Sequence, residues 1–164
     1  MIIYYDKKKY EVDDNITAEQ FAQKNEIKTN YTTCLVLINN EIRELTRVLK
    51  DNDEISFLDL TVKEARDAYM RTLSFIFLSA LKKTNPSAKC TIEHSLSNGI
   101  YCYIDNGRQV NRAVVSKIYE KMKEIVKEDI RINKLELTKS EAKKFYMEEN
   151  FDVKMGSVDR KSVV

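Results

Sequence analysis

The sequence has few of the residues that enzymes use for acid–base chemistry, metal binding or phosphate contact. Its 164 residues include one histidine, three glycines, one proline and no tryptophan. A single histidine excludes a metal site built from several histidines, and it leaves one candidate base for a serine or cysteine nucleophile. The glycines lie at 99, 107 and 156, so neither Gly-x-x-x-x-Gly-Lys nor Gly-x-Gly-x-x-Gly can be written. We therefore expect no P-loop and no metal in this chain.

Cysteine is also scarce, and its pattern indicates a reducing compartment. Cys34, Cys90 and Cys102 are odd in number, lack Cys-x-x-Cys spacing and lie in apolar strand-like runs, where cysteine behaves as a small hydrophobic residue. We expect them to be reduced and buried. No apolar run approaches the roughly 20 residues of a membrane span, and the first residues are charged where a secretory signal would be apolar. The sequence predicts a cytoplasmic protein without membrane contact.

The formal charge of +2 hides an uneven distribution along the chain. Residues 1–60 contain 8 Lys and Arg against 12 Asp and Glu, whereas residues 61–164 contain 20 against 14. Nucleic-acid-binding modules concentrate positive charge on one face, so the acidic first part argues against RNA contact there. In the second part, the lysines of residues 112–127 could follow phosphates, but the glutamates between them are more typical of a solvated helix face.

The first sixty residues predict a small sheet with one short helix. Strand-like runs cover residues 2–5, 9–12, 34–38 and 54–58, and the unbroken apolar run at 34–38 predicts a buried central strand. Thr17-x-x-Gln20 is a capping box that opens a helix. Asn39-Asn40 predicts a type I′ turn, because asparagine tolerates the left-handed conformation. Two strands, a helix and further strands on one sheet make a β-grasp arrangement.

Residues 61–155 predict a second, α+β domain in which a long helix packs on an antiparallel sheet. Thr61-x-x-Glu64 is another capping box, and apolar residues recur at helical spacing from there to Pro86, which predicts one broad core-facing side. Residues 156–164 lack periodicity and predict a linker. The other expected elements are strands at 88–93, 100–104 and 135–137, a helix over 112–127 capped by Asn111, and a helix from the capping box Thr138-x-x-Glu141 to residue 145.

Polar and aromatic residues gather around the predicted hairpin. His94 lies beside Ser95 and close to Asn98 at its end, so these residues could line a small polar site. The commoner alternative is a structural histidine that is hydrogen-bonded in a turn. Tyr101 and Tyr103 fall on one face of the second strand, where tyrosine rings stack on bases or, more commonly, stay half-buried in the sheet.

The order of these parts resembles the N-terminal region of threonyl-tRNA synthetases, in which a TGS β-grasp domain precedes a second additional, editing-type domain. The resemblance covers about residues 1–155. The matching segments are similar to the synthetase's Asp-Asn-Gly-Phe-Tyr segment, its Arg-Met-containing helix and its Val-Ser-x-x-Glu-Ala segment. In this chain they read Asn98-Gly-Ile-Tyr101, residues 112–125, and Leu137-Thr-Lys-Ser-Glu-Ala142.

A second family resembles the chain more closely. Bacterial proteins similar to uridine kinase and phosphoribulokinase carry this pair of domains ahead of a P-loop kinase domain. The segments that look like this family are Ile55-Ser-Phe-Leu-Asp-Leu60, Tyr69-x-Arg71 followed by Leu73-Ser-Phe75, and Thr91-Ile-Glu-His-Ser-Leu-Ser-Asn-Gly-Ile-Tyr-Cys102. The resemblance implies a nucleoside kinase whose kinase domain, with its ATP and Mg²⁺, follows Val164. No cofactor is then expected in this chain.

The synthetase resemblance also bears on catalysis. Its editing domains, like alanyl-tRNA editing proteins, use His-x-x-x-His on the long helix and a later Cys-x-x-x-His. Counted back from Pro86, the two helix positions are Arg71 and Phe75 here, and neither side chain can ligate zinc. The resemblance implies a lost metal site and no catalytic residue. Arg71 could bind an anion with Ser74 nearby, although an ion pair with a carboxylate such as Asp67 is commoner.

The sequence therefore predicts a non-catalytic binding or regulatory module of a uridine kinase-like protein. The alternatives are a tRNA-binding or aminoacyl-tRNA editing domain and a purely structural scaffold or dimerisation module. The expected partners are the chain's own kinase domain and a small anionic or nucleotide-like ligand, while tight tRNA binding is not expected and self-association stays open. The expected ligand site lies between the long helix and the hairpin and comprises Arg71, His94, Ser95, Asn98 and Tyr101.

Overall fold

The structure is a computed structural model that describes residues 1–96, 99–105, 110–130, 132 and 137–148. Backbone contacts divide the chain into two units, Met1–Ile125 and Val126–Val164, and each is described by itself. Helices and small sheets occur together, so the predicted α+β class is confirmed. The domain boundary near residue 60 stays a prediction, and the linker at 156–164 lies outside the described residues.

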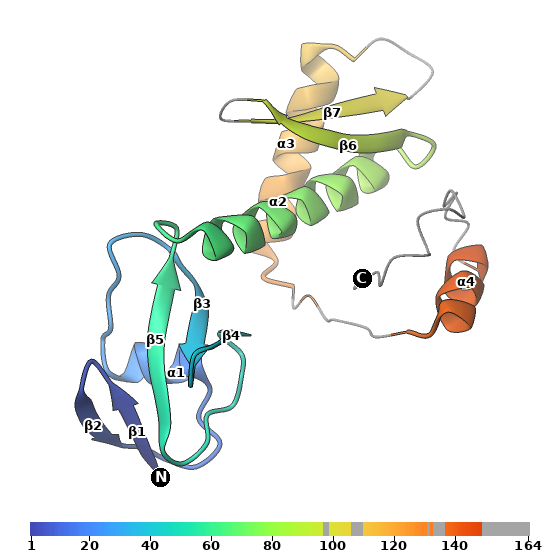
Figure 1. The fold of residues 1–164 in the computed structure, drawn as a ribbon. Coiled ribbons are helices and arrows are strands. Elements are labelled where there is room, and N and C mark those ends of the chain that lie inside the picture. The colour runs from blue at the N-terminus through green and yellow to red at the C-terminus, as the bar shows by residue number, and fades with distance from the viewer. Residues whose placement is uncertain (97–98, 106–109, 131, 133–136, 149–164) are drawn as a thin grey trace. The chain divides into compact units, whose positions relative to one another are not determined.

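The first sheet has five strands in the order β2-β1-β5-β3-β4 (Figure 1). β1 pairs in parallel with β5, whereas the pairs β1–β2, β3–β5 and β3–β4 are antiparallel. The four predicted strands are confirmed, and the polar strand β4 was not predicted. The bounds are β1 Ile2–Tyr5, β2 Lys8–Glu11, β3 Thr33–Ile38, β4 Glu41–Glu44 and β5 Asp53–Asp59.

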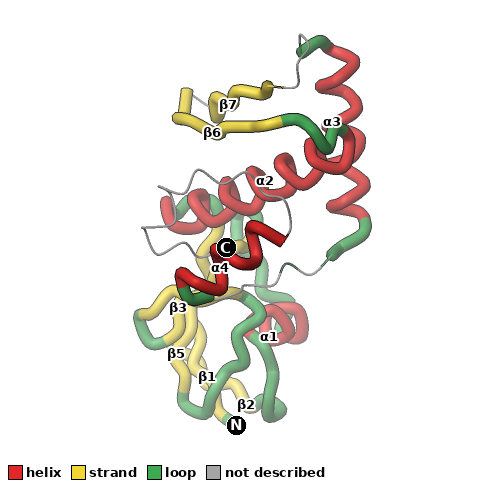
Figure 2. Tube along the Cα trace, turned by 90° about the vertical axis from the view of Figure 1, so that its right-hand side faces the viewer, coloured by secondary structure: helices red, strands yellow, loops and turns green. Residues whose placement is uncertain are grey.

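Helix α1, Ala18–Lys24, begins at the predicted capping box and covers one face of this sheet. The Thr17 hydroxyl accepts a hydrogen bond from the backbone N–H of Gln20 at 3.2 Å, and the Gln20 side chain accepts one from the N–H of Thr17 at 2.9 Å. Figure 2 shows α1 beside the strands. The capping box satisfies the N–H groups of Thr17 and Gln20, and those of Ala18 and Glu19 donate to the carbonyls of Arg47 and Leu45.

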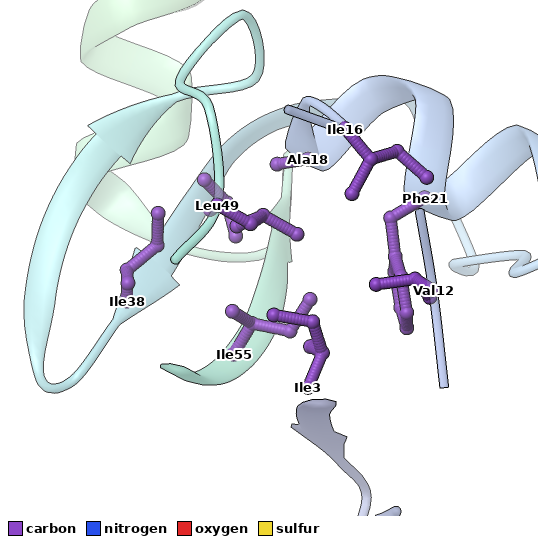
Figure 3. Packing of buried hydrophobic residues seen from close by; sticks show 9 residues of the cluster. Ile3, Val12, Ile16, Ala18, Phe21, Ile38, Leu49 and Ile55 are labelled. Carbon is purple, nitrogen blue, oxygen red and sulfur yellow. The ribbon is translucent and has the colours of Figure 1, made fainter. Parts of the chain in front are cut away.

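The first hydrophobic core lies between α1 and the sheet (Figure 3). Ile3, Phe21 and Val36 are fully buried there. The Phe21 ring meets those of Tyr10 and Tyr5 edge to face, with centroids 5.3 Å and 6.2 Å apart. Aromatic pairs at such separations add to the free energy gained from apolar burial. Phe21 therefore connects the helix to both strands of the first hairpin.

The hairpin of β3 and β4 confirms the predicted turn and corrects a burial prediction. Asn39 and Asn40 have φ angles of 50° and 65°, which is the left-handed conformation that asparagine tolerates. β3 pairs with β5 on one side and β4 on the other, so it is an inner strand as predicted, although β5 is the middle one. Within 34–38 only Val36 and Ile38 are buried, because one face of β3 packs on the core and the other is half-covered.

The start of helix α2, Lys63–Thr84, also differs from the prediction. Val62 is the N-cap and makes no side-chain cap hydrogen bond, so the expected capping box of Thr61 and Glu64 is wrong. The hydroxyl of Thr61 instead donates to Oδ1 of Asp59 at 2.5 Å, and its backbone N–H donates to the same atom at 2.9 Å. These bonds hold Thr61 in the turn before the helix. The side chain that was expected to cap α2 therefore stabilises the end of β5.

The second core gathers where α2 ends. Ala80 and Leu81 of α2 and Ile118 of α3 are buried in it, and the half-buried Cys90 and Ile104 of the hairpin pack against them. The predicted strands are confirmed and longer, and Asn111 caps α3 as predicted, because its Oδ1 accepts from the N–H of Val114 at 3.0 Å. The bounds are β6 Lys89–Leu96, β7 Gly99–Asp105 and α3 Arg112–Lys127.

Two burial predictions for this region need correction. The broad apolar side of α2 is only partly buried. Ala65, Ala80 and Leu81 are buried. Tyr69 and Leu73 are exposed, because the second core begins beyond them. The three cysteines are free but half-buried rather than buried. Each lies on a strand face that is only partly covered. No described helix is long and apolar enough to cross a membrane.

The second unit contains helix α4, Lys139–Glu148, whose predicted capping box is confirmed. Glu141 Oε2 accepts from the N–H of Thr138 at 2.8 Å, and the Thr138 hydroxyl accepts from the N–H of Glu141 at 3.4 Å. The helix continues three residues beyond the predicted end at residue 145. Of the predicted strand at 135–137, residues 135 and 136 lie outside the described residues.

We expect Phe21→Ala to lower the free energy of unfolding by about 3–5 kcal/mol, because it removes a fully buried ring at the centre of the first core. Urea denaturation followed by circular dichroism measures the loss. Gln23→Ala, an exposed substitution on the same helix, is the matched control and should stay within about 0.5 kcal/mol of the wild type. Equal stability of the two variants would show that the core is assigned to the wrong residues.

We expect Asp59→Asn to destabilise the fold at neutral pH and to matter less in acid. Hydrogen bonds from the Thr61 hydroxyl and N–H, and from Tyr31 N–H at 3.2 Å, hold the pKa of Asp59 below its ordinary value. A folded-state pKa below the unfolded one gives stability that is present above about pH 4 and is lost as the pH falls through the folded pKa. Melting curves from pH 7 to pH 3 test this. A constant difference between wild type and variant, or an equal effect of the exposed control Asp6→Asn, would contradict it.

Candidate functional site

The hairpin of β6 and β7 presents two aromatic rings to solvent. Tyr101 and Tyr103 are 47% and 56% exposed, and the alternation of side chains along β7 puts Cys102 and Ile104 on the opposite, core-facing side. Thr91 lies across from Tyr103. Both rings are thus more exposed than the half-buried alternative expects, and stacking on a base stays a prediction.

Arg71 lies on the exposed surface of α2, as does Phe75 one turn later. The expected ion pair of Arg71 with Asp67 is not the one that forms, because Asp67 pairs with Lys63 at 2.5 Å. This pairing lowers the pKa of Asp67, and the charge of Arg71 contributes to the same shift. Ser74 is half-buried. Arg71 is therefore positioned to attract an anion in solution, near one carboxylate that is already paired.

The other predicted site residues are only partly described. The backbones of His94 and Ser95 belong to β6, while their side chains and the whole of Asn98 lie outside the described residues. Tyr101 is on the face of β7 that points away from the second core, whereas Phe77 of α2 packs against that core. Three of the five side chains lie outside the described residues, so the five-residue site stays a prediction.

The groove between β7 and α3 is a feature that the sequence did not predict. It has a volume of about 650 Å³, and Phe77 of α2, Tyr103 and Ile104 of β7, and Val115, Tyr119 and Met122 of α3 are among its lining residues. The sequence pattern that indicates this groove lies in α3. Val115, Tyr119 and Met122 form a second apolar stripe there, beside Val114 and Ile118, which face the core. Only the charged residues of this helix were considered in the prediction from the sequence, so the outer stripe was missed.

The described residues contain no group of three or more His, Cys, Asp or Glu side chains that could hold a metal ion. Two thiols do lie close together, because Cys90 and Cys102 occupy neighbouring strands on the core-facing side. Burial raises the pKa of Cys90 to about 11, and the adjacent Cys102 thiol adds to this shift. Cys90 is therefore a protonated thiol at neutral pH and a poor nucleophile.

No protein-family model matches the chain. Similar proteins do exist, and they are threonine–tRNA ligases. The ligase of Acetivibrio thermocellus is 30% identical over 140 residues, which is 85% of this chain and 22% of the ligase. That of Clostridium novyi is 27% identical over 154 residues, or 94% of this chain and 24% of the ligase. In Clostridioides difficile the ligase is 30% identical over 118 residues, or 72% of this chain and 18% of the ligase.

The chain thus spans less than a quarter of the length of these relatives. The match covers both predicted domains, since it extends over up to 94% of the chain. It supports the resemblance to threonyl-tRNA synthetases. The predicted uridine kinase-like parent, with its ATP and Mg²⁺, has no support from these relatives. The chain is homologous to one part of the threonine–tRNA ligases.

Proposed function

We propose that this chain is a non-catalytic, tRNA-binding accessory module of the kind that precedes the catalytic part of threonine–tRNA ligases. The observation that carries the proposal is the similarity to those ligases along 85–94% of the chain. In this proposal residues 1–60 are a TGS-like β-grasp domain and residues 61–155 an editing-type domain. The tRNA-binding function, which was an alternative in the sequence analysis, is now the favoured one, and the interpretation as a kinase module is set aside.

The sheet topology supports the β-grasp part of the proposal. A parallel pair, β1 with β5, lies within the sheet, hairpins lie on both sides of it, and α1 covers one face. The connection from β2 to β3 carries α1, so the helix follows the first hairpin as that arrangement requires. The sheet and its helix have a core of their own.

The proposal includes the loss of editing chemistry, on the basis of two side chains. Counted back from Pro86, the positions expected for the helix histidines of the editing site hold Arg71 and Phe75. A guanidinium and a phenyl ring cannot replace imidazole as zinc ligands. Losing two of four ligands removes the free energy that would hold the metal. The module would therefore contact tRNA without hydrolysing its ester.

Electrostatics favours contact through the second domain. Residues 61–164 carry 20 Lys and Arg against 14 Asp and Glu, and the first sixty residues have the opposite balance. Phosphate contacts by exposed cations supply most of the affinity of non-specific RNA binding. Arg71 is such a cation, and the exposed ring of Tyr101 could stack on an unpaired base. The proposed contacts at the tRNA end are the five residues expected for an anionic ligand: Arg71, His94, Ser95, Asn98 and Tyr101.

This proposal revises the expectation that tRNA does not bind tightly. We expect the chain to bind tRNA with an affinity that falls as salt rises, and to leave mischarged tRNA unhydrolysed. Fluorescence anisotropy across a salt series measures the first, and release of the amino acid from mischarged tRNA measures the second. Arg71→Ala should reduce the slope of log K against log salt by roughly 0.7–0.9, the loss of one phosphate contact.

Arg43→Ala is the matched control, because Arg43 lies in the acidic first domain and pairs with Glu41. It should leave tRNA affinity unchanged. If tRNA does not bind at low salt, the proposed function is wrong and the scaffold alternative takes its place. If Arg71→Ala and Arg43→Ala weaken tRNA binding equally, the contact with tRNA is not centred on the second domain.

A further inference from the structure

Helix α3 carries an apolar stripe along the edge of the second core, and Met122, one of its residues, packs against that core. Val115, Tyr119 and Met122 recur at a spacing of four and three residues, which is one side of a helix. Val115 and Tyr119 are 55% and 58% exposed, although Ile118 between them is buried. Across the groove lie Tyr103 and Phe77. The groove therefore has apolar walls from three elements, and its α3 wall is largely uncovered in the described part of the chain.

Positive charge borders this stripe. Arg112 lies three residues before Val115 and Lys123 four residues after Tyr119, so both lie along the outer edge of the stripe. The Lys123 ammonium is 4.9 Å from the centre of the Tyr119 ring and 2.7 Å from Glu120. Lys123 is thus already paired, so Arg112 is the cation that a partner filling the groove would meet first. Charge complementarity thus favours an occupant with carboxylates along one edge.

A second copy of the chain does not fit this requirement. If two antiparallel α3 helices met through the same stripe about a two-fold axis, the same edge of each would lie side by side. Arg112 of one copy would then lie near Lys123 of the other, and like charges in such positions are destabilising. Single-stranded RNA fits less well too. Val115 and Met122 offer no ring for stacking, and Lys123 already lies over the ring of Tyr119.

We propose that this groove binds an amphipathic helix of a partner polypeptide, with its apolar side against α3 and β7 and carboxylates beside Arg112 and Lys123. Helix-in-groove recognition uses apolar anchors at helical spacing, and the stripe offers the matching positions. The groove volume of about 650 Å³ accommodates several side chains of such a helix. The proposal is independent of tRNA binding, because the groove uses none of the five residues proposed for the tRNA end.

The test uses the full chain and two labelled synthetic peptides of about 18 residues with the same leucine stripe, a length that gives five helical turns. One has glutamates along one edge of the stripe, and the other has lysines there. We expect the glutamate peptide to bind at least about tenfold more tightly than the lysine peptide at low salt, a difference that corresponds to about 1.4 kcal/mol. Val115→Ser with Tyr119→Ser should weaken binding by a similar factor, and Arg112→Glu with Lys123→Glu should reverse the preference.

Tyr31→Ser is the matched control, because Tyr31 is a 62% exposed ring in the first sixty residues. It should leave peptide binding unchanged. All substituted side chains are largely exposed, so circular dichroism and melting temperature should stay close to the wild type. Equal binding of both peptides, or unchanged binding by the Val115 and Tyr119 variant, would overturn the proposal. A dimer of the chain that the Val115 and Tyr119 variant abolishes would also overturn the proposal. A complex with single-stranded RNA that this variant abolishes would do the same.

Discussion

The buried carboxylate of Asp59 determines how the chain passes from the first sheet to its longest helix. It accepts hydrogen bonds from Tyr31 in the preceding loop and from both the N–H and the hydroxyl of Thr61. Arg66, one turn into α2, returns to the same turn by donating to the carbonyls of Leu60 and Thr61 at 3.1 Å and 2.7 Å. A carboxylate that stays ionised is well suited to this position, because the donors of Tyr31 and Thr61 stabilise the negative charge of Asp59.

The two cores of the first unit differ in how completely they are covered. In the first, α1 and one sheet face enclose Ile3, Phe21 and Val36 without any exposure. In the second, a two-stranded sheet lies against two helices, and such a sheet has too little area to bury both helices on all their apolar sides. The exposed stripe of α3 and the exposed rings of β7 follow from that shortage. The apolar side chains that stay exposed on α3 and β7 therefore border the second core.

Capping boxes show where sequence reasoning succeeds and where it fails. Thr17 with Gln20, and Thr138 with Glu141, form the predicted reciprocal hydrogen bonds, because each pair involves only neighbours in sequence. Thr61 with Glu64 has the same pattern and does not form a cap. The competitor is Asp59, whose position beside Thr61 depends on the end of β5. The periodicity of a helix likewise predicts an apolar side, but not how much of it another element covers.

The same limit applies to the candidate site. The alternation of β7 and the helical spacing of α2 were read from the sequence, so the exposure of Tyr101 and Arg71 agrees with local geometry. Their convergence in one cleft depends on how a hairpin lies on a helix, and β7 turns Tyr101 to the side away from the second core. That packing brings together segments far apart in the sequence, so neither the alternation of β7 nor the spacing of α2 predicts it.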